Sequence, residues 1–321
     1  MNILIIRFSA LGDLVTLEPT FRAFRYFFPT AHITLLTSAI GKGLYEDTPY
    51  FNDFIIHKKF LHTMTQARSQ HFDLVVNLQC SKPSHYLNFF IKKNRTINKS
   101  FNLWQKMFGI KTHSKNAHEM LLLAGCEEKF LVSYFNIPDH MTIQFPIQKE
   151  ISSHKHIAIS TGSSPRWNSK KWGIEKYEKL IEDLLSHGFK ITLVGSKLEE
   201  TDATYLKEKF PSLSNHVSQT TLAELKKILA NVSLYIGNDS GPTHIAASVS
   251  TDTLTIFGPT DIQHSPKFGN YKGIHLYVKP SPNVSCHPCY KGTCPTQHEC
   301  MHSIDPKQVL NLVLTHLQDT K

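Results

Sequence analysis

The feature that most constrains this chain is a regular alternation of short apolar runs with longer amphipathic segments. The apolar runs are typical of buried strands, and we expect strands at 2–8, 32–38, 53–57, 72–79, 156–161, 190–195, 232–237 and 253–258. The sequence between or after these runs favours helices at 14–28, 116–124, 174–187, 221–230, 242–249 and 306–318. Because strands separated by helices pair in parallel, the pattern predicts an α/β fold with helices on both faces of its sheets.

The alternation occurs twice, and 321 residues are enough for two domains of ordinary size. A polar stretch at 140–155 separates the two halves, so we expect domains at 1–150 and 151–321. Open parallel sheets bind ligands at the carboxyl ends of their strands. Two such domains facing each other would leave a cleft, and the loops that follow the strands would line it.

The net charge limits the choice of partners and location. The chain holds 35 Lys and Arg against 26 Asp and Glu, a formal charge of +9, which favours anionic partners. Lys92, Lys93, Arg95 and Lys99 form a cluster that predicts either a solvated loop or a patch attracting an acidic substrate. No apolar run is long enough to cross a bilayer, and the N-terminal run is too short for a signal peptide, so a cytosolic location is the expectation.

Polar residues follow the first strand in the stretch "RFSALGDLV", residues 7–15. Asp13 stands at the start of the next helix, where a carboxylate is either a cap or a group set for chemistry. A second turn, "YIGNDSGPTHIAAS" at 235–248, leaves a strand and enters a helix near Pro242. Exposed N–H groups and the helix dipole attract phosphate at such a start. The hydroxyls and imidazole of Ser240, Thr243 and His244 add further polar groups.

Two more strand-end loops carry similar chemistry. The stretch "STGSSPRWNSKKWGIEKY" at 160–177 places Lys170 and Lys171 just before a helix, where the dipole disfavours cations unless an anion lies nearby. "FGPTD" at 257–261 combines a hydroxyl with a carboxylate. No Asp-x-Asp pair occurs in the chain, so we expect lysine and helix N–H groups, rather than a divalent cation, to stabilise a diphosphate.

Four cysteines are clustered as C-x2-C-x4-C-x5-C near the C-terminus: Cys286, Cys289, Cys294 and Cys300. Thiolates at such short spacing could enclose zinc or iron as a structural site, or they could stay as reduced thiols. Disulfides are disfavoured in a reducing compartment.

Taken together and in order, these motifs resemble glycosyltransferase family 9, the ADP-heptose:lipopolysaccharide heptosyltransferases. The resemblance covers "ILIIRFSALGDLVTLEPTFRAFR", "TGSSPRWNSKKW", "GNDSGPTHIAA", "FGPTD" and "CHPCYKGTCPTQHECM", which span nearly the whole chain. It implies a GT-B fold, with two facing Rossmann-like domains, parallel sheets and a central cleft. The acceptor would bind the N-terminal domain and the nucleotide-sugar the C-terminal domain.

The resemblance also implies roles for individual residues. Asp13 matches the proposed general base, Lys171 the lysine that contacts the donor phosphates, and Asp239 the carboxylate that holds the donor sugar. The remaining donor-binding positions are Thr161, Gly162, Ser240, Gly241, Pro242, Thr243 and His244, with Glu199 or Glu200 as a ribose-binding acid. The family needs no catalytic cofactor.

The resemblance thus implies inverting transfer of heptose from ADP-heptose to the anionic inner core of lipopolysaccharide. Peripheral contact with the inner face of the cytoplasmic membrane would suit such an acceptor, and "LNFFIKKNR" at 87–95 is a candidate for it, unless Phe89 and Phe90 belong to the core. Two alternatives stay open: transfer of heptose to protein hydroxyls, and a basic nucleic-acid-binding protein with a metal knuckle. The absence of a nucleic-acid motif counts against the second.

Overall fold

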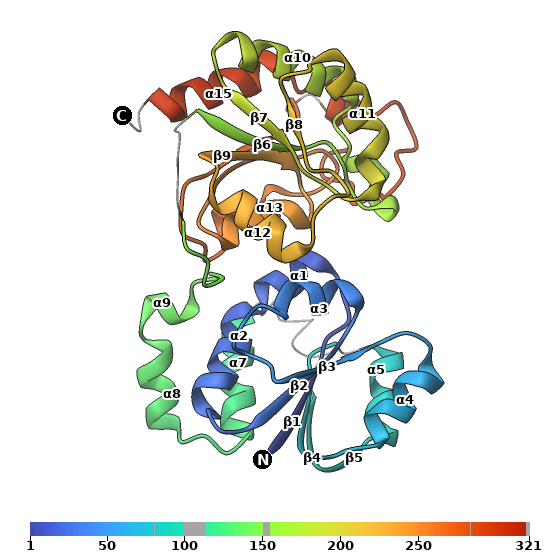
Figure 1. Cartoon of the computed structure of the whole chain (residues 1–321), viewed down its shortest axis with the longest axis vertical. Helices are drawn as coiled ribbons and strands as arrows, with labels where there is room; N and C mark the ends of the chain where they lie inside the picture. The colour runs from blue at the N-terminus through green and yellow to red at the C-terminus, as the bar shows by residue number, and fades with distance from the viewer. Residues whose placement is uncertain (80, 99–112, 150–154, 283, 319–321) are drawn as a thin grey trace. The chain divides into compact units, whose positions relative to one another are not determined.

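The computed structural model describes residues 1–79, 81–98, 113–149, 155–282 and 284–318, and Figure 1 shows how its elements are connected. The chain divides into two compact units, Met1–Ile143 (unit 1) and Gln144–Lys321 (unit 2). The boundary expected between residues 150 and 151 lies outside the described residues. Among the described helices, none has both the length and the apolarity that crossing a membrane requires.

Unit 1 is built on a five-stranded parallel sheet in the order β3-β2-β1-β4-β5. Its strands are β1 (Asn2–Ile6), β2 (His32–Thr37), β3 (Asp53–Ile56), β4 (His71–Asn77) and β5 (Lys92–Asn98). Its helices are α1 (Leu11–Thr16), α2 (Glu18–Phe27), α3 (Ala39–Tyr45), α4 (Phe60–Arg68), α5 (Lys82–Phe90), α7 (His113–Leu123), α8 (Glu128–Phe135) and α9 (Pro138–Met141). Helices α4 and α5 lie on one side of the sheet and α2 and α7 on the other (Figure 1).

Unit 2 is built on a six-stranded parallel sheet in the order β11-β10-β9-β6-β7-β8. The strands are β6 (His156–Ser160), β7 (Lys190–Leu193), β8 (Ser214–Asn215), β9 (Leu234–Asn238), β10 (Asp252–Ile256) and β11 (His275–Val278). The α-helices are α10 (Ile174–Ser186), α11 (Glu200–Lys209), α12 (Leu222–Ala230), α13 (Gly241–Ser248), α14 (Glu299–His302) and α15 (Pro306–Gln318). Short 3-10 helices are η1 (Pro165–Lys170), η2 (Lys197–Glu199), η3 (Ile262–His264) and η4 (Pro266–Phe268).

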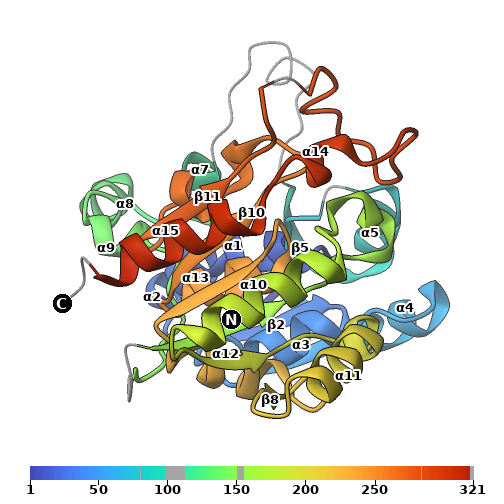
Figure 2. The ribbon, with the colours of Figure 1, turned by 90° about the horizontal axis from the view of Figure 1, so that it is seen from above.

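The sheet of unit 2 is covered by helices on both faces. Figures 1 and 2 show α10 and α15 on one face and α12 and α13 on the other. Leu180 and Ile181 of α10 and Val313 of α15 join strand residues such as Ile157 and Leu234 in one buried cluster. Because both faces are covered, strands β6, β7, β9 and β10 are buried almost throughout, as central parallel strands are.

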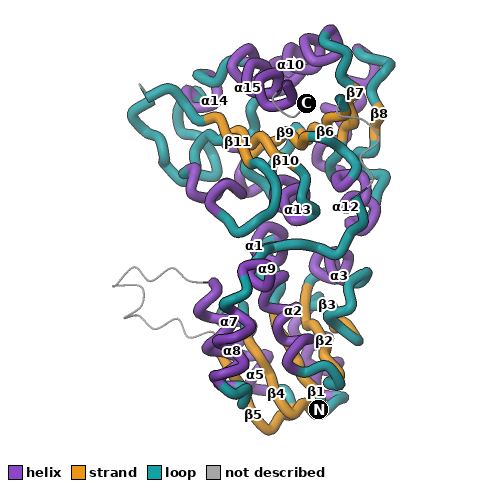
Figure 3. The backbone as a smooth tube through the Cα atoms, turned by 90° about the vertical axis from the view of Figure 1, so that its left-hand side faces the viewer, coloured by secondary structure: helices purple, strands orange, loops and turns teal. Residues whose placement is uncertain are grey.

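The structure confirms the parallel α/β architecture expected from the alternation and corrects several details. The helix expected at 14–28 is two helices, α1 and α2, and Pro19 occupies the first turn of α2, where its missing N–H costs no hydrogen bond. The solvated loop expected around Lys92 is wrong. Residues 92–98 form the edge strand β5 beside β4 (Figure 3), so pairing with a neighbouring strand outweighs their polar composition. Lys99 lies outside the described residues.

The sheet order of unit 2 brings three sequence motifs together. Strand β9 pairs with β6 on one side and with β10 on the other, all in parallel. Ser160, Asn238 and Ile256 end these strands at the same edge of the sheet. The loops at 161–173, 239–241 and 257–261 therefore leave the sheet side by side.

Candidate active site

Asp239 is the centre of a polar network at this edge of unit 2. One carboxylate oxygen, Oδ2, accepts hydrogen bonds from the Lys170 ammonium at 2.6 Å and from the Thr260 hydroxyl at 2.7 Å. The Lys170 ammonium also donates to the Asp239 backbone oxygen at 3.2 Å and lies 4.8 Å from the centre of the Trp167 ring. Asp239 is 8 % exposed and Lys170 13 % exposed. The three motifs thus meet in one largely buried ion pair.

The two lysines before Trp172 have different surroundings. The Lys170 ammonium reaches Asp239, whereas Lys171, which the family resemblance assigns to the donor phosphates, takes no part in this ion pair. The Lys171 side chain is half-buried, and the described part of the chain provides its ammonium with no hydrogen bond or ion pair. The sequence contains no sign of the Lys170 ion pair, because both lysines occupy the same loop. Cations just before a helix require a nearby anion, and for Lys170 that anion is the carboxylate of Asp239.

Asn238 holds the neighbouring loop in place, and the sequence analysis missed it. Its side-chain amide donates to the backbone oxygens of Thr161 at 2.9 Å and Gly162 at 3.0 Å. Its side-chain oxygen accepts a hydrogen bond from the Tyr177 hydroxyl at 3.1 Å, and its backbone oxygen accepts one from Thr243 at 2.7 Å. This fully buried asparagine therefore fixes the loop after β6 against the start of α13.

The start of α13 suits an anion, as the sequence predicts. Ser240 is the N-cap residue and makes no side-chain cap hydrogen bond. Gly241 and Pro242 are the first two helical residues, so the first turn presents backbone N–H groups that no side chain of the N-cap occupies. His244, three residues further on, is half-buried, and its Nδ1 lies 2.9 Å from the Tyr271 hydroxyl.

Glu199 lies beneath two of the strand-end loops. Its side chain fills the space beside Gly162 and Gly195, so that a Cβ at either glycine would collide with its carboxylate. Its Oε2 accepts hydrogen bonds from the Ser196 backbone N–H at 2.6 Å and the Ser196 hydroxyl at 2.9 Å. Glu199 is therefore packed against the loop that holds Gly162, whereas Glu200 is exposed in the first turn of α11.

Thr161 belongs to the same part of unit 2. Its hydroxyl donates to Asp202 at 2.9 Å, and its side chain is buried. Asp202 is in the first turn of α11, so this bond ties the loop after β6 to that helix.

Asp13 has a different setting in unit 1. Its Oδ2 lies 2.8 Å from the Arg7 guanidinium and accepts the Ala10 backbone N–H at 3.2 Å, which is the bond that a cap makes. Asp13 is 59 % exposed, and the described residues donate no hydrogen bond to its Oδ1. The structure therefore contains the cap and, on the same side chain, a second oxygen open to solvent.

The cysteine-rich segment lies against two of the strand-end loops. The backbone N–H groups of Cys289 and Tyr290 both donate to the Pro259 oxygen, at 3.0 and 2.9 Å. The Ser169 N–H donates to the Gly292 oxygen at 3.0 Å. A Cβ on Gly292 would collide with the Arg166 backbone oxygen, so only glycine permits this approach. The segment thus joins the loop that carries Lys170 to the loop that carries Thr260.

The four thiols do not fit the expected metal. Cys286 is exposed, Cys289 and Cys294 are half-buried and Cys300 is buried, and all are free thiols. Burial raises the pKa of Cys300 to about 11, with smaller contributions from the other three thiols. Within the described ranges, no group of three or more His, Cys, Asp and Glu side chains is arranged to hold a metal ion.

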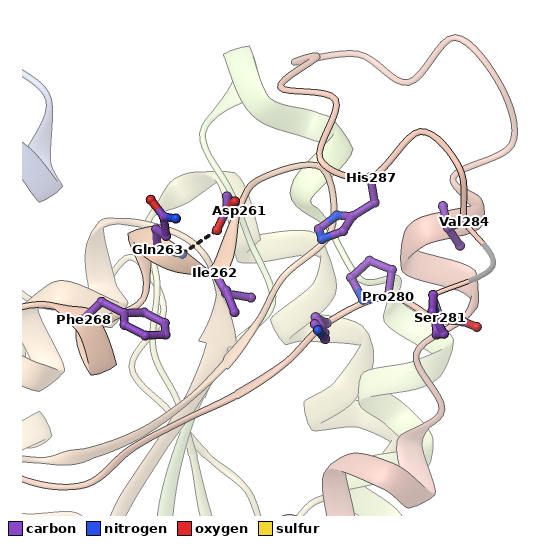
Figure 4. Close-up of a pocket in the computed structure, with 10 residues that line it drawn as sticks. Asp261, Ile262, Gln263, Phe268, Pro280, Ser281, Val284 and His287 are labelled. Carbon is purple, nitrogen blue, oxygen red and sulfur yellow. Dashed lines mark hydrogen bonds between the residues drawn. The ribbon is translucent and has the colours of Figure 1, made fainter. Parts of the chain in front are cut away.

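A pocket of about 490 Å³ lies beside these loops, at the carboxyl ends of β10 and β11 (Figure 4). Asp261, Lys279 and His287 provide its charged or titratable groups and Phe268 an aromatic ring. Asp261 accepts the Gln263 backbone N–H at 2.8 Å, and the His287 Nδ1 lies 2.7 Å from the Gly258 oxygen. Because Asp261 follows Thr260, the pocket adjoins the Asp239 network.

Comparisons with known proteins agree with this architecture. The chain is 27 % identical over 314 residues to lipooligosaccharide heptosyltransferase 2 of Campylobacter jejuni. The aligned region covers 94 % of this chain and 93 % of that relative. Among solved structures, it resembles E. coli ADP-heptose lps heptosyltransferase II over all of both chains (TM-score 0.74, 18 % identity). It also resembles E. coli heptosyltransferase WaaC with ADP-2-deoxy-2-fluoro heptose over 98 % of this chain and all of that one (TM-score 0.71, 15 % identity).

The likeness to these structures confirms the GT-B fold of the heptosyltransferases. The family model described as "Glycosyltransferase family 9 (heptosyltransferase)" matches residues 61–299, about three quarters of the chain. The chain therefore belongs to glycosyltransferase family 9 and is a glycosyltransferase.

Proposed function

We propose that this protein transfers heptose, with inversion, from ADP-heptose to the inner core of lipopolysaccharide, without a catalytic cofactor. The observation that carries the proposal is the network of Asp239, Lys170 and Thr260 beside the uncapped start of α13. The curated relatives support the substrate pair, because their names specify lipooligosaccharide or lipopolysaccharide heptosyltransferases. In this proposal unit 2 binds the donor and unit 1 the acceptor.

The chemistry on the donor side follows from charge. As the bond between the anomeric carbon and ADP breaks, the electron pair leaves with the diphosphate. The N–H groups at the start of α13 and a nearby ammonium stabilise that developing charge. In this proposal Lys171 contacts the phosphate directly and Lys170 orients Asp239, because Lys170 already has a carboxylate partner. The second oxygen of Asp239, Oδ1, is then the acceptor for donor-sugar hydroxyls.

Asp13 is the proposed general base. The acceptor hydroxyl attacks the anomeric carbon, and its proton passes to the Asp13 carboxylate as the new C–O bond forms. A carboxylate suffices for this role, because the hydroxyl becomes acidic only as the bond forms. The exposed Oδ1 is the atom that would take the proton, while Oδ2 is held by Arg7 and the Ala10 N–H.

Four further proposals concern the remaining donor groups and the setting. Glu199 or Glu200 would bind the ribose, and Thr161 and Gly162 would line the phosphate loop. His244 would complete the polar wall near the diphosphate. An acceptor anchored in lipid places the reaction at the inner face of the cytoplasmic membrane. Transfer to protein hydroxyls is the second candidate, but the curated relatives favour the polysaccharide acceptor.

The test uses purified protein, ADP-heptose and a lipid-free inner-core oligosaccharide. Release of ADP together with a heptose-extended product would support the proposal. A thermal-shift panel of ADP-, UDP- and GDP-sugars identifies the donor independently, because a ligand stabilises the fold that binds it. Stabilisation by a UDP-sugar, with none by ADP compounds, would overturn the donor assignment.

A further inference from the structure

The positive charge of this chain is concentrated in a small part of unit 1. Residues 54–98 hold seven Lys and Arg against one acidic residue, Asp73, whereas the rest of the chain holds 28 against 25. Asp73 is already engaged, since its two oxygens accept hydrogen bonds from the Asn2 backbone N–H at 2.7 Å and the Asn94 amide at 3.2 Å. The cations of this segment therefore have little local compensation and attract an anionic partner.

Helix α5 has one buried face and one exposed face. Its buried stripe consists of Ser84, Leu87, Asn88 and, just after the helix, Ile91. Its exposed stripe, with the same helical spacing, consists of Lys82, His85, Tyr86 and Phe89. Tyr86 is 63 % exposed and Phe89 79 % exposed. The expectation that Phe89 could belong to the core is thus wrong, and α5 presents aromatic rings between positively charged or titratable side chains.

Contact between α4 and α5 joins this stripe to a second segment of similar composition. The rings of Phe60 and Phe90 lie 6.3 Å apart, and Phe89 packs on Phe90 at 5.2 Å. Leu61, next to Phe60, is 71 % exposed. Phe60 also packs against the core of unit 1, so it anchors an apolar cluster that continues outward to solvent.

Lysines flank the apolar cluster on both segments. Lys58 and Lys59 precede α4, and Lys92 follows α5; all three are exposed, and no ion pair to any of them occurs in the part of the chain that the structure describes. Lys93 is different, because its ammonium binds the backbone oxygens of Asn88 and Ile91 and thereby closes the end of α5. We define the basic–aromatic surface as Lys58, Lys59, Leu61, Phe89, Phe90 and Lys92.

We propose that the basic–aromatic surface docks this protein onto an anionic lipid bilayer. Exposed lysines and arginines are drawn to anionic headgroups, and exposed aromatic and leucine side chains enter the boundary between headgroups and acyl chains. A second copy of the chain is a poor partner, because an isologous contact would place like charges face to face. The proposal deepens the proposed function, on which it rests for the lipid-linked acceptor.

The test is sedimentation of the purified full chain with vesicles of phosphatidylethanolamine and phosphatidylglycerol, and with vesicles of phosphatidylcholine alone. Wild-type protein is expected to bind the anionic vesicles and to lose that binding as salt is raised. Each charge removed in Lys58→Gln or Lys92→Gln is expected to weaken partitioning about fivefold. Phe89→Ser is expected to weaken it at least tenfold. Matched controls are Phe130→Ser, an exposed aromatic on α8, and Lys307→Gln, an exposed lysine on α15.

The outcomes separate this proposal from the proposed function. Loss of vesicle binding in the surface variants, with both controls unchanged, supports it. Equal binding to both vesicle types, no binding at low salt, or binding that the surface variants leave intact overturns it. A dimer that forms at high protein concentration and is abolished by Phe89→Ser would also overturn the proposal. The same holds for RNA binding that replaces lipid binding and is abolished by Phe89→Ser. Heptose transfer to the lipid-free acceptor is measured in parallel. If transfer fails but the vesicles are still bound, the proposed function is wrong and the docking surface is still supported.

Discussion

Each unit of the molecule has an ion pair in the segments that follow its strands, and the two ion pairs differ in how far they are buried. In unit 2, Asp239 and Lys170 are 2.6 Å apart, and both are nearly buried. In unit 1, Asp13 and Arg7 are 2.8 Å apart, but Asp13 is 59 % exposed. A buried carboxylate with a fixed partner is suited to positioning, and an exposed one with a free oxygen is suited to exchanging a proton.

Asp13→Asn gives the largest expected loss of activity. The amide oxygen of Asn can still accept the Ala10 N–H, so the helix start keeps its cap, but the side chain can no longer take a proton. We expect the transfer rate to fall by about 10²–10⁴ and the free energy of unfolding to change by less than about 1 kcal/mol. Steady-state kinetics and urea unfolding measure the two effects. A transfer rate near that of the wild type would leave Asp13 as a cap only.

Lys170→Met is expected to affect both stability and activity. Removing one partner leaves the Asp239 carboxylate buried without its cation, which lowers the free energy of unfolding by about 3 kcal/mol. Donor turnover is expected to fall with it, because Asp239 loses its orientation. The matched control is Lys171→Met, which should change stability by less than about 0.5 kcal/mol. Equal destabilisation by the two variants would contradict the placement of Lys170.

Thr260→Val tests the second hydrogen bond to Asp239. The change keeps the shape of the side chain and removes the donor at 2.7 Å. Loss of a hydrogen bond to a charged group is expected to lower the free energy of unfolding by about 1.5–3 kcal/mol. The melting temperature without ligand measures this loss of stability, and the melting temperature with ADP-heptose shows whether the donor site is weakened. A stability equal to that of the wild type would show that Lys170 alone holds Asp239.

Arg7→Met tests the exposed pair. Because Asp13 is mostly in solvent, its ion pair with Arg7 is expected to contribute less than about 1 kcal/mol to stability. Arg7 also donates to the Leu78 oxygen at 3.0 Å, so part of any loss comes from that bond. Chemical denaturation of Arg7→Met beside Lys170→Met compares the two pairs directly. A larger loss in Arg7→Met would reverse the contrast.

A third pair, Asp252 with His316, provides a control away from the strand-end loops. Burial acts to raise the pKa of Asp252, but hydrogen bonds from His316 and the Ile274 N–H outweigh it, and the pKa lies below its ordinary value of 3.8. A carboxyl with a lowered pKa stabilises the fold above its unfolded pKa and loses that contribution as the pH falls through the folded pKa. Asp252→Asn should therefore flatten the loss of stability below about pH 4 and leave the transfer rate unchanged.

The sequence predicted the parallel sheets well because their strands are apolar on both faces, as the runs at 156–161 and 190–195 show. It missed β5, since Lys92, Lys93 and Arg95 give no strand pattern and only pairing with β4 makes them one. It also missed α4 and α5, because Leu61 and Phe89 are apolar but exposed and therefore obscure the helical spacing of the buried residues. Both residues belong to the basic–aromatic surface.

The candidate site was predicted in its loops but not in its contacts. Asp239 and the start of α13 followed from their place after a strand. The ion pair between Lys170 and Asp239 did not, because the direction of a side chain at the end of a short 3-10 helix is set by the surrounding packing. Asn238 carried a weak signal: a polar residue ending an apolar strand must find partners when it is buried. Its partners, the Thr161 and Gly162 oxygens, are more than 70 residues away in the chain.

The most direct test of the account is calorimetric titration of ADP-heptose, with no acceptor present, into the wild type, Asp13→Asn and Lys170→Met. We predict that Asp13→Asn binds ADP-heptose as the wild type does, because its carboxylate serves the acceptor, and that Lys170→Met binds about tenfold more weakly, because Asp239 loses its orientation toward the sugar. Weakened ADP-heptose binding in Asp13→Asn, with unchanged binding in Lys170→Met, would contradict the division of roles between the two carboxylates.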